Sequence, residues 1–244
     1  MDADPRLVVH RQIWDEKPAL QKIYADYYRR IAAHCAKGPT LEIGAGAGHI
    51  REYLDQVYMA DILPAEWLDM AADAQQLPFG DASLDNIVML DVLHHIEQPA
   101  VLFNEVARVL RPGGRIVMLD PGITIGSWPV YKFLHAEPVN MSVDPLREGE
   151  SQSSGDPFDS NQAVPTLLFS NADRCKRFEL KFPALKVAVR QFFGFATYPL
   201  TGGFQNWCFV PSGAVSPLLS IERCLEPILA RLLGFRLLVV LERV

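Results

Sequence analysis

The sequence is poor in cysteine and in positive charge, and each shortage excludes a class of protein. Its four cysteines include no Cys-x-x-Cys pair, so we expect neither a zinc ribbon nor a disulfide framework, and reduced thiols are favoured. The net charge is -6, and no basic stripe is present. A partner with a phosphate backbone is therefore not expected, and we predict no nucleic-acid binding.

Long apolar runs and a basic leader are also missing. No stretch reaches the roughly 18 consecutive apolar residues of a membrane-spanning helix. The first residues are acidic, so we expect no secretory signal and a cytoplasmic protein. What the chain does have is 244 residues with 49% hydrophobic content, which suffices for one α/β domain with a full core.

The most informative segment is a glycine-rich run at residues 41–50, LEIGAGAGHI. An apolar stretch leads into Gly44, Gly46 and Gly48, and an amphipathic stretch follows, which predicts a strand, a tight turn and a helix. Glycines lack a Cβ atom, so a ligand can approach the backbone closely and φ can be positive. The helix N-terminus would add free N–H groups and a positive dipole end. The segment predicts a nucleoside-type cofactor site, with a tight turn that binds nothing as the alternative.

The spacing of the glycines separates two types of cofactor. A dinucleotide site carries Gly-x-Gly-x-x-Gly, because the third glycine lets the helix pack closely while a pyrophosphate binds at its N-terminus. This chain has Gly-x-Gly-x-Gly instead, and Glu42 stands two positions before the first glycine. The departure argues against a nicotinamide-dependent oxidoreductase, which we keep as a minor alternative.

Two further segments supply carboxylates to such a site. Val57–Asp61 reads as a short strand, and the carboxylate of Asp61 can accept hydrogen bonds from both hydroxyls of a ribose. Asp73 follows after only about twelve residues, which leaves no room for a full crossover helix. We therefore expect at most one helical turn after Asp61, and a third strand over residues 67–73.

The next segments complete a recognisable order. Ser83–His95 predicts a strand with polar residues at its end, and Ala107–Asp120 predicts a helix, a Pro-Gly-Gly turn and another strand. With the glycine loop and the two carboxylates, they resemble the class I S-adenosylmethionine-dependent methyltransferases over residues 39–121. The Leu-Pro-Phe and Leu-His-His segments look like the type 11 branch, which includes ubiquinone and menaquinone biosynthesis enzymes.

The resemblance implies a fold, a cofactor and an activity. The fold is a Rossmann-like, doubly wound α/β sheet of seven strands in the order 3-2-1-4-5-7-6, with the last strand antiparallel. The cofactor is S-adenosyl-L-methionine, and the partner is a small-molecule methyl acceptor that is methylated at oxygen or carbon. The motifs of DNA-methylating enzymes, an Asn/Asp-Pro-Pro-aromatic run and a Pro-Cys nucleophile, are absent.

The resemblance also implies which residues hold the cofactor. The glycine loop and Glu42 would hold its methionine part, Asp61 its ribose, and the segment from Asp73 its adenine. The implied cofactor-binding residues are Glu42, Gly44, Ala45, Gly46, Gly48, Asp61, Ile62, Asp73, Ala74 and Leu90.

Methyl transfer from a sulfonium needs an in-line nucleophile and the exclusion of water. A general base helps when the acceptor is a hydroxyl or a carbon acid. The candidates are His95 and His94 at the end of the fourth strand, with Tyr131 and His135 further along the chain. No dense cluster of ligating residues is visible, so we expect no metal. The shortened crossover and the lack of an obvious base favour one alternative, an inactive cofactor-binding or regulatory module.

The rest of the chain divides into three parts. We expect a helical lead-in over residues 1–38 and a methyltransferase domain over 39–244. Residues 121–170 form a lid or substrate insertion with a mobile polar centre at 142–161.

Ser216 and Pro217 predict the start of the last helix, and Gly234 predicts its end. Its expected apolar face consists of Leu218, Ile221, Leu225, Ile228 and Leu232. The oligomeric state stays open, a homo-oligomer included.

Overall fold

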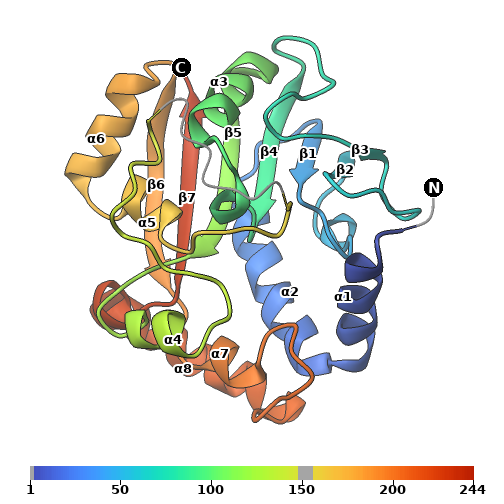
Figure 1. Ribbon diagram of the computed structural model, residues 1–244, viewed down its shortest axis with the longest axis vertical. Coiled ribbons are helices and arrows are strands. Elements are labelled where there is room, and N and C mark those ends of the chain that lie inside the picture. The colour runs from blue at the N-terminus through green and yellow to red at the C-terminus, as the bar shows by residue number, and fades with distance from the viewer. Residues whose placement is uncertain (1–2, 148–155) are drawn as a thin grey trace.

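In the computed structural model, which describes residues 3–147 and 156–244, seven strands form one sheet in the order β3-β2-β1-β4-β5-β7-β6 (Figure 1). Neighbouring strands from β3 to β5 are parallel, and β7 is antiparallel to both β5 and β6. This arrangement confirms the predicted fold class and strand order. The strands are β1 (Thr40–Ile43), β2 (Val57–Asp61), β3 (Met70–Ala71), β4 (Leu84–Leu90), β5 (Leu110–Pro121), β6 (Leu185–Phe193) and β7 (Arg236–Arg243).

Helices cover both faces of this sheet, so its central strands are apolar on both sides. Met89 of β4 packs with helices α3, α5 and α6, whereas the next residue, Leu90, packs with α2 and α8 on the other face. The longer helices are α1 (Pro5–Glu16), α2 (Pro18–Ala32), α3 (Pro99–Val109), α6 (Ala172–Lys181) and α8 (Ser212–Leu233). The short ones are η1 (Ile50–Glu52), η2 (Leu93–His95), α4 (Trp128–Phe133), α5 (Val164–Phe169) and α7 (Thr197–Thr201).

The parallel strands all end at one edge of the sheet. The strand order reverses direction between β1 and β4, and a crevice forms outside the carboxyl ends at such a point. Figure 1 shows α2, α4 and α7 gathered at this edge, toward which the arrowheads of β1, β4 and β5 point. The fold therefore places the glycine loop after β1 next to segments that are distant in sequence.

The helix predicted after the glycine loop is absent, and that prediction was wrong. Only the 3-10 turn η1 follows, because the chain must return to start β2 at Val57. Helices α1 and α2 take over its packing role: Trp14 stacks on His49 at 4.0 Å between ring centroids, and Tyr28 stacks on Tyr53 at 5.2 Å. No macrodipole of a long helix acts on a ligand in this loop.

The crossover from β2 to β3 carries no helix among its residues 62–69, as the short spacing predicts. The third strand is shorter than expected, since only Met70 and Ala71 pair with β2, through Ala60 and Asp61. Backbone hydrogen bonds replace the missing helix: Asp69 donates its N–H to Met59, and Ala72 donates to Asp61.

Helix α8 differs from its prediction in start and in orientation. It begins at Ser212, one turn before the expected Ser216, and ends at Gly234 as expected. Its predicted apolar face is largely turned outward, with Ile221 57% and Ile228 78% exposed. Val215, Leu219 and Ala230 are buried instead, together with the carboxylate of Glu222.

The insertion after β5 contributes α4 and α5 to the described residues. Its predicted mobile centre, 142–161, includes residues 148–155, which lie outside the described part of the chain. Within the described ranges, no helix is long and apolar enough to cross a membrane.

Candidate active site

A cavity of about 360 Å³ opens at the carboxyl ends of the parallel strands. Its wall combines the glycine loop, the ends of β2 and β4, the N-terminal helices, the insertion and the start of β7. Its volume falls in the range of small-molecule sites. Nine of the ten predicted cofactor residues line it, all except Gly48.

The glycine loop is held in a fixed shape by its neighbours. Gly44 has a φ of 66°, and a Cβ atom there would lie 2.3 Å from Cγ2 of Val92. Gly46 donates its N–H to Asp61 Oδ2 at 3.0 Å and accepts a hydrogen bond from Trp67 Nε1 at 2.8 Å. The loop therefore lines the cavity on one side and is fixed by these hydrogen bonds on the other. Gly48 has a positive φ in the turn but does not line the cavity.

Glu42 is the most informative residue of the cofactor end. It is only 2% exposed, it lines the cavity, and its Oε2 atom has no hydrogen-bond partner among the described residues. Burial raises the pKa of its carboxyl well above the ordinary value, and the nearby charge of Asp61 adds to the shift. An unpartnered buried carboxylate suits a cationic ligand. This feature fits S-adenosylmethionine, which carries an ammonium and a sulfonium group.

The remaining cofactor residues continue along the same wall. Asp61 accepts backbone N–H bonds from Gly46 and from Leu63, and burial raises its pKa. Ile62 is half exposed beside it, and Ala74 is buried. Asp73 accepts the N–H of Gln75 at 2.8 Å, which fixes its carboxylate at the rim. Asp61 and Asp73, which the sequence predicts to hold a ribose and an adenine, thus line the same cavity.

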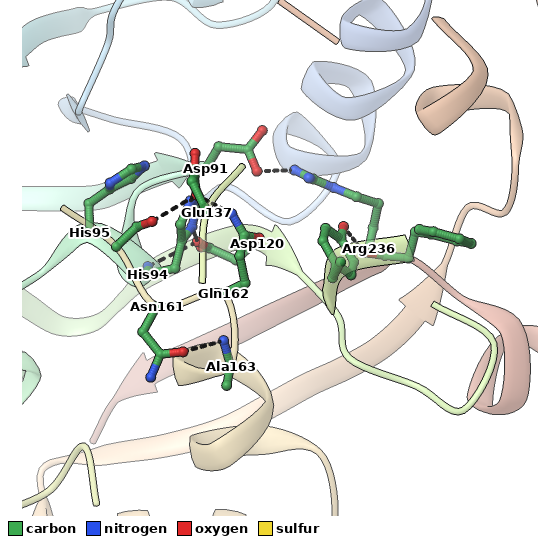
Figure 2. A network of polar contacts seen from close by, with 12 residues as sticks. Asp91, His94, His95, Asp120, Glu137, Asn161, Gln162, Ala163 and Arg236 are labelled. Atoms are coloured by element: carbon green, nitrogen blue, oxygen red, sulfur yellow. Dashed lines mark hydrogen bonds and ion pairs between the residues drawn. The ribbon is translucent and has the colours of Figure 1, made fainter. Parts of the chain in front are cut away.

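His94 is held between two carboxylates. Its Nδ1 lies 2.8 Å from Oδ1 of Asp120, and its Nε2 lies 3.3 Å from Oε2 of Glu137 (Figure 2). Burial alone would lower the pKa of His94, but the hydrogen bonds to the two carboxylates outweigh it and raise the pKa to about 10. With both ring nitrogens engaged, His94 has no free nitrogen to accept a proton from an acceptor in this state.

His95 has a different environment, although its ring centroid is 4.2 Å from that of His94. Its Nδ1 lies 3.1 Å from the backbone oxygen of Asp159. Burial and the charge of His94 lower its pKa to about 4, so the imidazole is neutral at pH 7. His95 also lines the cavity, so a neutral imidazole is part of the cavity wall.

The other two candidates also line the cavity, from the insertion. Tyr131 is buried and donates its hydroxyl to the backbone oxygen of Phe235 at 2.8 Å, and burial raises its pKa. His135 accepts the N–H of Glu137 on Nδ1 at 3.2 Å, and burial lowers its pKa. Tyr131 therefore has a structural partner, while His135 lies at the exposed mouth.

Two residues of the site were missed by the sequence prediction. Arg236 is 1% exposed, pairs with Asp91 (Figure 2), and has its Nε atom unpartnered among the described residues. Its guanidinium lies over the rings of Tyr27 and Tyr198 at 5.0 and 5.3 Å. Glu137 comes from the insertion, where no pattern marks it. The sequence does carry a signal for Arg236, because this arginine directly precedes the apolar run at residues 237–241 and pairs with Pro121 at the end of β5.

The comparisons with known proteins concern mainly the first half of the chain. Residues 41–118 match a family model described as "Methyltransferase domain". The 27-O-demethylrifamycin SV methyltransferase of Amycolatopsis mediterranei is 41% identical over 66 residues, which are 27% of this chain and 24% of that protein. A probable S-adenosylmethionine-dependent methyltransferase of Mycolicibacterium smegmatis is 32% identical over 108 residues, 38% of this chain and 42% of the relative. The chain thus spans less than half the length of these curated relatives.

Solved structures extend the similarity in fold to nearly the whole chain. A SAM-dependent methyltransferase from Archaeoglobus fulgidus has a TM-score of 0.52 at 15% identity and covers 93% of this chain and 95% of its own. A geranyl diphosphate methyltransferase in complex with SAM has a TM-score of 0.51 at 14% identity, covering 91% and 85%. The quinone-biosynthesis branch is not singled out by any of these matches. The family match therefore identifies a methyltransferase domain at residues 41–118, and the sheet order and the solved structures show that the chain as a whole has the fold of S-adenosylmethionine-dependent methyltransferases.

Proposed function

We propose that the chain transfers the methyl group of S-adenosylmethionine to an oxygen or carbon atom of a small molecule. One observation carries the proposal: the cavity lined by the predicted cofactor residues is also lined by polar and aromatic side chains outside that set. We call this part of the cavity the acceptor chamber. It is lined by His95, Tyr24, Tyr198 and Arg236, and none of these is a predicted cofactor residue. A volume of about 360 Å³ lies in the range of small-molecule sites.

At the cofactor end, we assign each carboxylate one task. Glu42 receives the positive charge of the methionine part, Asp61 accepts the ribose hydroxyls, and Asp73 faces the adenine. The bound sulfonium supplies an activated methyl group with a neutral leaving group. The loop from Gly44 to Gly48 keeps the backbone close to the ligand, because its shape is fixed by Asp61 and Trp67.

At the acceptor end, the chain's residues exclude water and orient the acceptor. Helices α1 and α2 cover one side, and Tyr131, His135 and Glu137 of the insertion cover another. Tyr24 donates its hydroxyl to Asp91 at 3.1 Å, and Asp91 pairs with Arg236, so this wall is rigid and polar. Such an environment suits a molecule with a hydroxyl group and an apolar body. The names of two relatives, 27-O-demethylrifamycin SV methyltransferase and O-methyltransferase cnsE of Penicillium expansum, favour oxygen as the methylated atom.

The experiment is a transfer assay with S-adenosylmethionine that carries an isotopically labelled methyl group. The purified chain is incubated with a small-molecule extract and with a panel of phenols, hydroxy acids and enolisable ketones. We expect the label in a product that is one methyl heavier than its precursor, and accumulation of S-adenosylhomocysteine.

The controls separate activity from binding. Asp61→Asn should abolish most transfer by weakening the cofactor site, whereas Glu52→Gln, at an exposed side chain outside the cavity, should not change it. Tight cofactor binding without transfer to any acceptor would contradict the proposed activity and favour the inactive module instead.

A further inference from the structure

Three side chains at the acceptor end form a compact set of possible metal ligands. Each of His94, His95 and Glu137 offers one ligand atom, and these atoms lie within 4.8 Å of one another. All three residues line the cavity, and His94 is buried. The set joins η2, directly after β4, with the insertion after β5, so spacing in the sequence did not reveal it.

The distances fit direct coordination. In a four-coordinate zinc site with bonds of about 2.0–2.1 Å, neighbouring ligand atoms lie about 3.3–3.4 Å apart. The Nε2 atom of His94 lies 3.3 Å from Oε2 of Glu137. One edge of the coordination polyhedron is therefore already formed, and the ligand atom of His95 lies within 4.8 Å of the other two.

Each proposed ligand also has a hydrogen-bond partner that fixes its orientation, as metal ligands usually do. The Nδ1 atom of His94 contacts Asp120 at 2.8 Å, and the Nδ1 atom of His95 contacts the backbone oxygen of Asp159 at 3.1 Å. Both contacts place a proton on Nδ1 and make Nε2 the coordinating atom. At His94, the ion would replace the proton between Nε2 and Glu137, which is released to solvent. Glu137 accepts hydrogen bonds from Ser160 and Gln162, which fix its carboxylate (Figure 2 shows Gln162 beside it).

The charges favour a dication as well. Two carboxylates, those of Asp120 and Glu137, contact the same imidazole in a site that is mostly closed to solvent. A divalent ion on Nε2 would balance both negative charges at once. Two imidazoles and one carboxylate suit zinc, manganese, iron or cobalt, whereas magnesium prefers oxygen ligands and keeps its water.

We propose that His94, His95 and Glu137 bind one divalent transition-metal ion, with zinc as the best fit to the ligand set. Three protein ligands leave at least one coordination position, which opens into the cavity toward the acceptor. Binding of the ion does not depend on the proposed activity. Its role, to position an oxygen atom of the acceptor beside the cofactor, rests on the proposed function.

The experiment uses tag-free, chelator-treated protein titrated with Co²⁺, whose visible absorption reports inner-sphere ligands. We expect one equivalent to bind with a visible band, and Zn²⁺ to displace it. Glu137→Gln and His95→Gln should each abolish the band. Asp120→Asn removes the charge behind His94 and should weaken binding by about 10- to 100-fold. Mg²⁺ at the same concentration should not compete.

The matched controls are His34→Gln and Glu52→Gln, because neither residue lines the cavity, and both variants should bind Co²⁺ like the wild type. Cooperative thermal unfolding of each variant shows that the band is not lost through misfolding. Absence of stoichiometric Co²⁺ binding, or equal binding by Glu137→Gln, would overturn the site. If labelled methyl is still transferred in that case, only the metal site is wrong. If Co²⁺ binds and no acceptor is methylated, only the proposed activity is wrong.

Discussion

At the residue scale, the cavity wall contains two buried charged side chains, Glu42 and Arg236, each with one polar atom that a bound ligand can satisfy. Within residues 3–147 and 156–244, Oε2 of Glu42 and Nε of Arg236 have no hydrogen-bond partner, and both side chains lie in the wall of one cavity. An unsatisfied buried polar group costs stability, about 1–3 kcal/mol and more when it is charged. A bound cofactor or acceptor removes this cost, so binding and stability are linked at these positions.

The raised pKa of Glu42 predicts how cofactor binding depends on pH. The cationic cofactor favours the ionised carboxylate, so affinity should fall as pH falls through the raised pKa of the free protein. The stability of the free protein should change in the opposite direction. Its folded state binds this proton more tightly than the unfolded state, so stability rises as pH falls through the same window.

Calorimetry of cofactor binding and thermal unfolding from pH 8 to pH 4 test both signs. Glu42→Gln should lower affinity at pH 8 by about 10- to 100-fold, the loss of one charge-assisted hydrogen bond, and should flatten the part of the profile due to this residue. Parallel pH profiles for the wild type and Glu42→Gln would refute the assignment.

The glycine loop offers a test of its backbone shape. Gly44→Ala places a Cβ atom 2.3 Å from Val92 at a positive φ, so it should reduce the free energy of unfolding by about 1–3 kcal/mol or more. Gly80→Ala is the matched control, since no atom of the described residues lies within 4 Å of its added Cβ, and a change within about 0.5 kcal/mol is expected. Equal denaturant midpoints for the two variants would show that the loop has another conformation.

At the element scale, helix α8 shows where pattern and packing disagree. The sequence predicts an apolar face through Ile228, but the structure exposes 78% of that side chain and buries Leu219. The hydrogen bonds of one buried carboxylate explain this orientation of the helix. Glu222 turns inward to accept the N–H groups of Phe195 and Thr197, which orients the helix against the β6–α7 connection.

This orientation predicts a specific ranking of substitutions. Leu219→Ala should cost about 2–5 kcal/mol of unfolding free energy, as for a buried leucine, whereas Ile228→Ala should cost less than about 0.5 kcal/mol. Urea unfolding of the two variants measures the difference. A large cost for Ile228→Ala would mean that the helix packs on the face predicted from sequence.

The same scale explains how much of the structure could be predicted. The sequence predicted the strands that have strong local patterns, such as β1 before the glycines and β4 before the histidines. Predicted cofactor residues lie at the ends of these strands. The helix after Gly48 was predicted wrongly. Helices α1 and α2 pack against this segment instead, and such contacts between residues distant in sequence leave no local pattern. Glu137 and Arg236 join the site only through topology, and no local pattern reports such contacts.

At the scale of the whole molecule, one sheet edge gathers a cofactor cradle, an acceptor chamber and a set of metal ligands. The ends of the parallel strands bring the cradle and, through η2 after β4, His94 and His95; the insertion adds Glu137, and the antiparallel β7 adds Arg236. Each part of the cavity wall comes from a different region of the sequence. The matched family domain, residues 41–118, supplies the cradle, and the remaining residues supply most of the chamber.

The measurement that tests the central claim most directly is calorimetric titration of the folded chain with S-adenosylhomocysteine, with NAD titrated in parallel. One equivalent of S-adenosylhomocysteine should bind, Asp61→Asn should weaken it by about 10- to 100-fold, Glu52→Gln should not, and NAD should give no heat of binding. Failure of the folded wild-type chain to bind S-adenosylhomocysteine, or equal binding by Asp61→Asn, would contradict the assigned site.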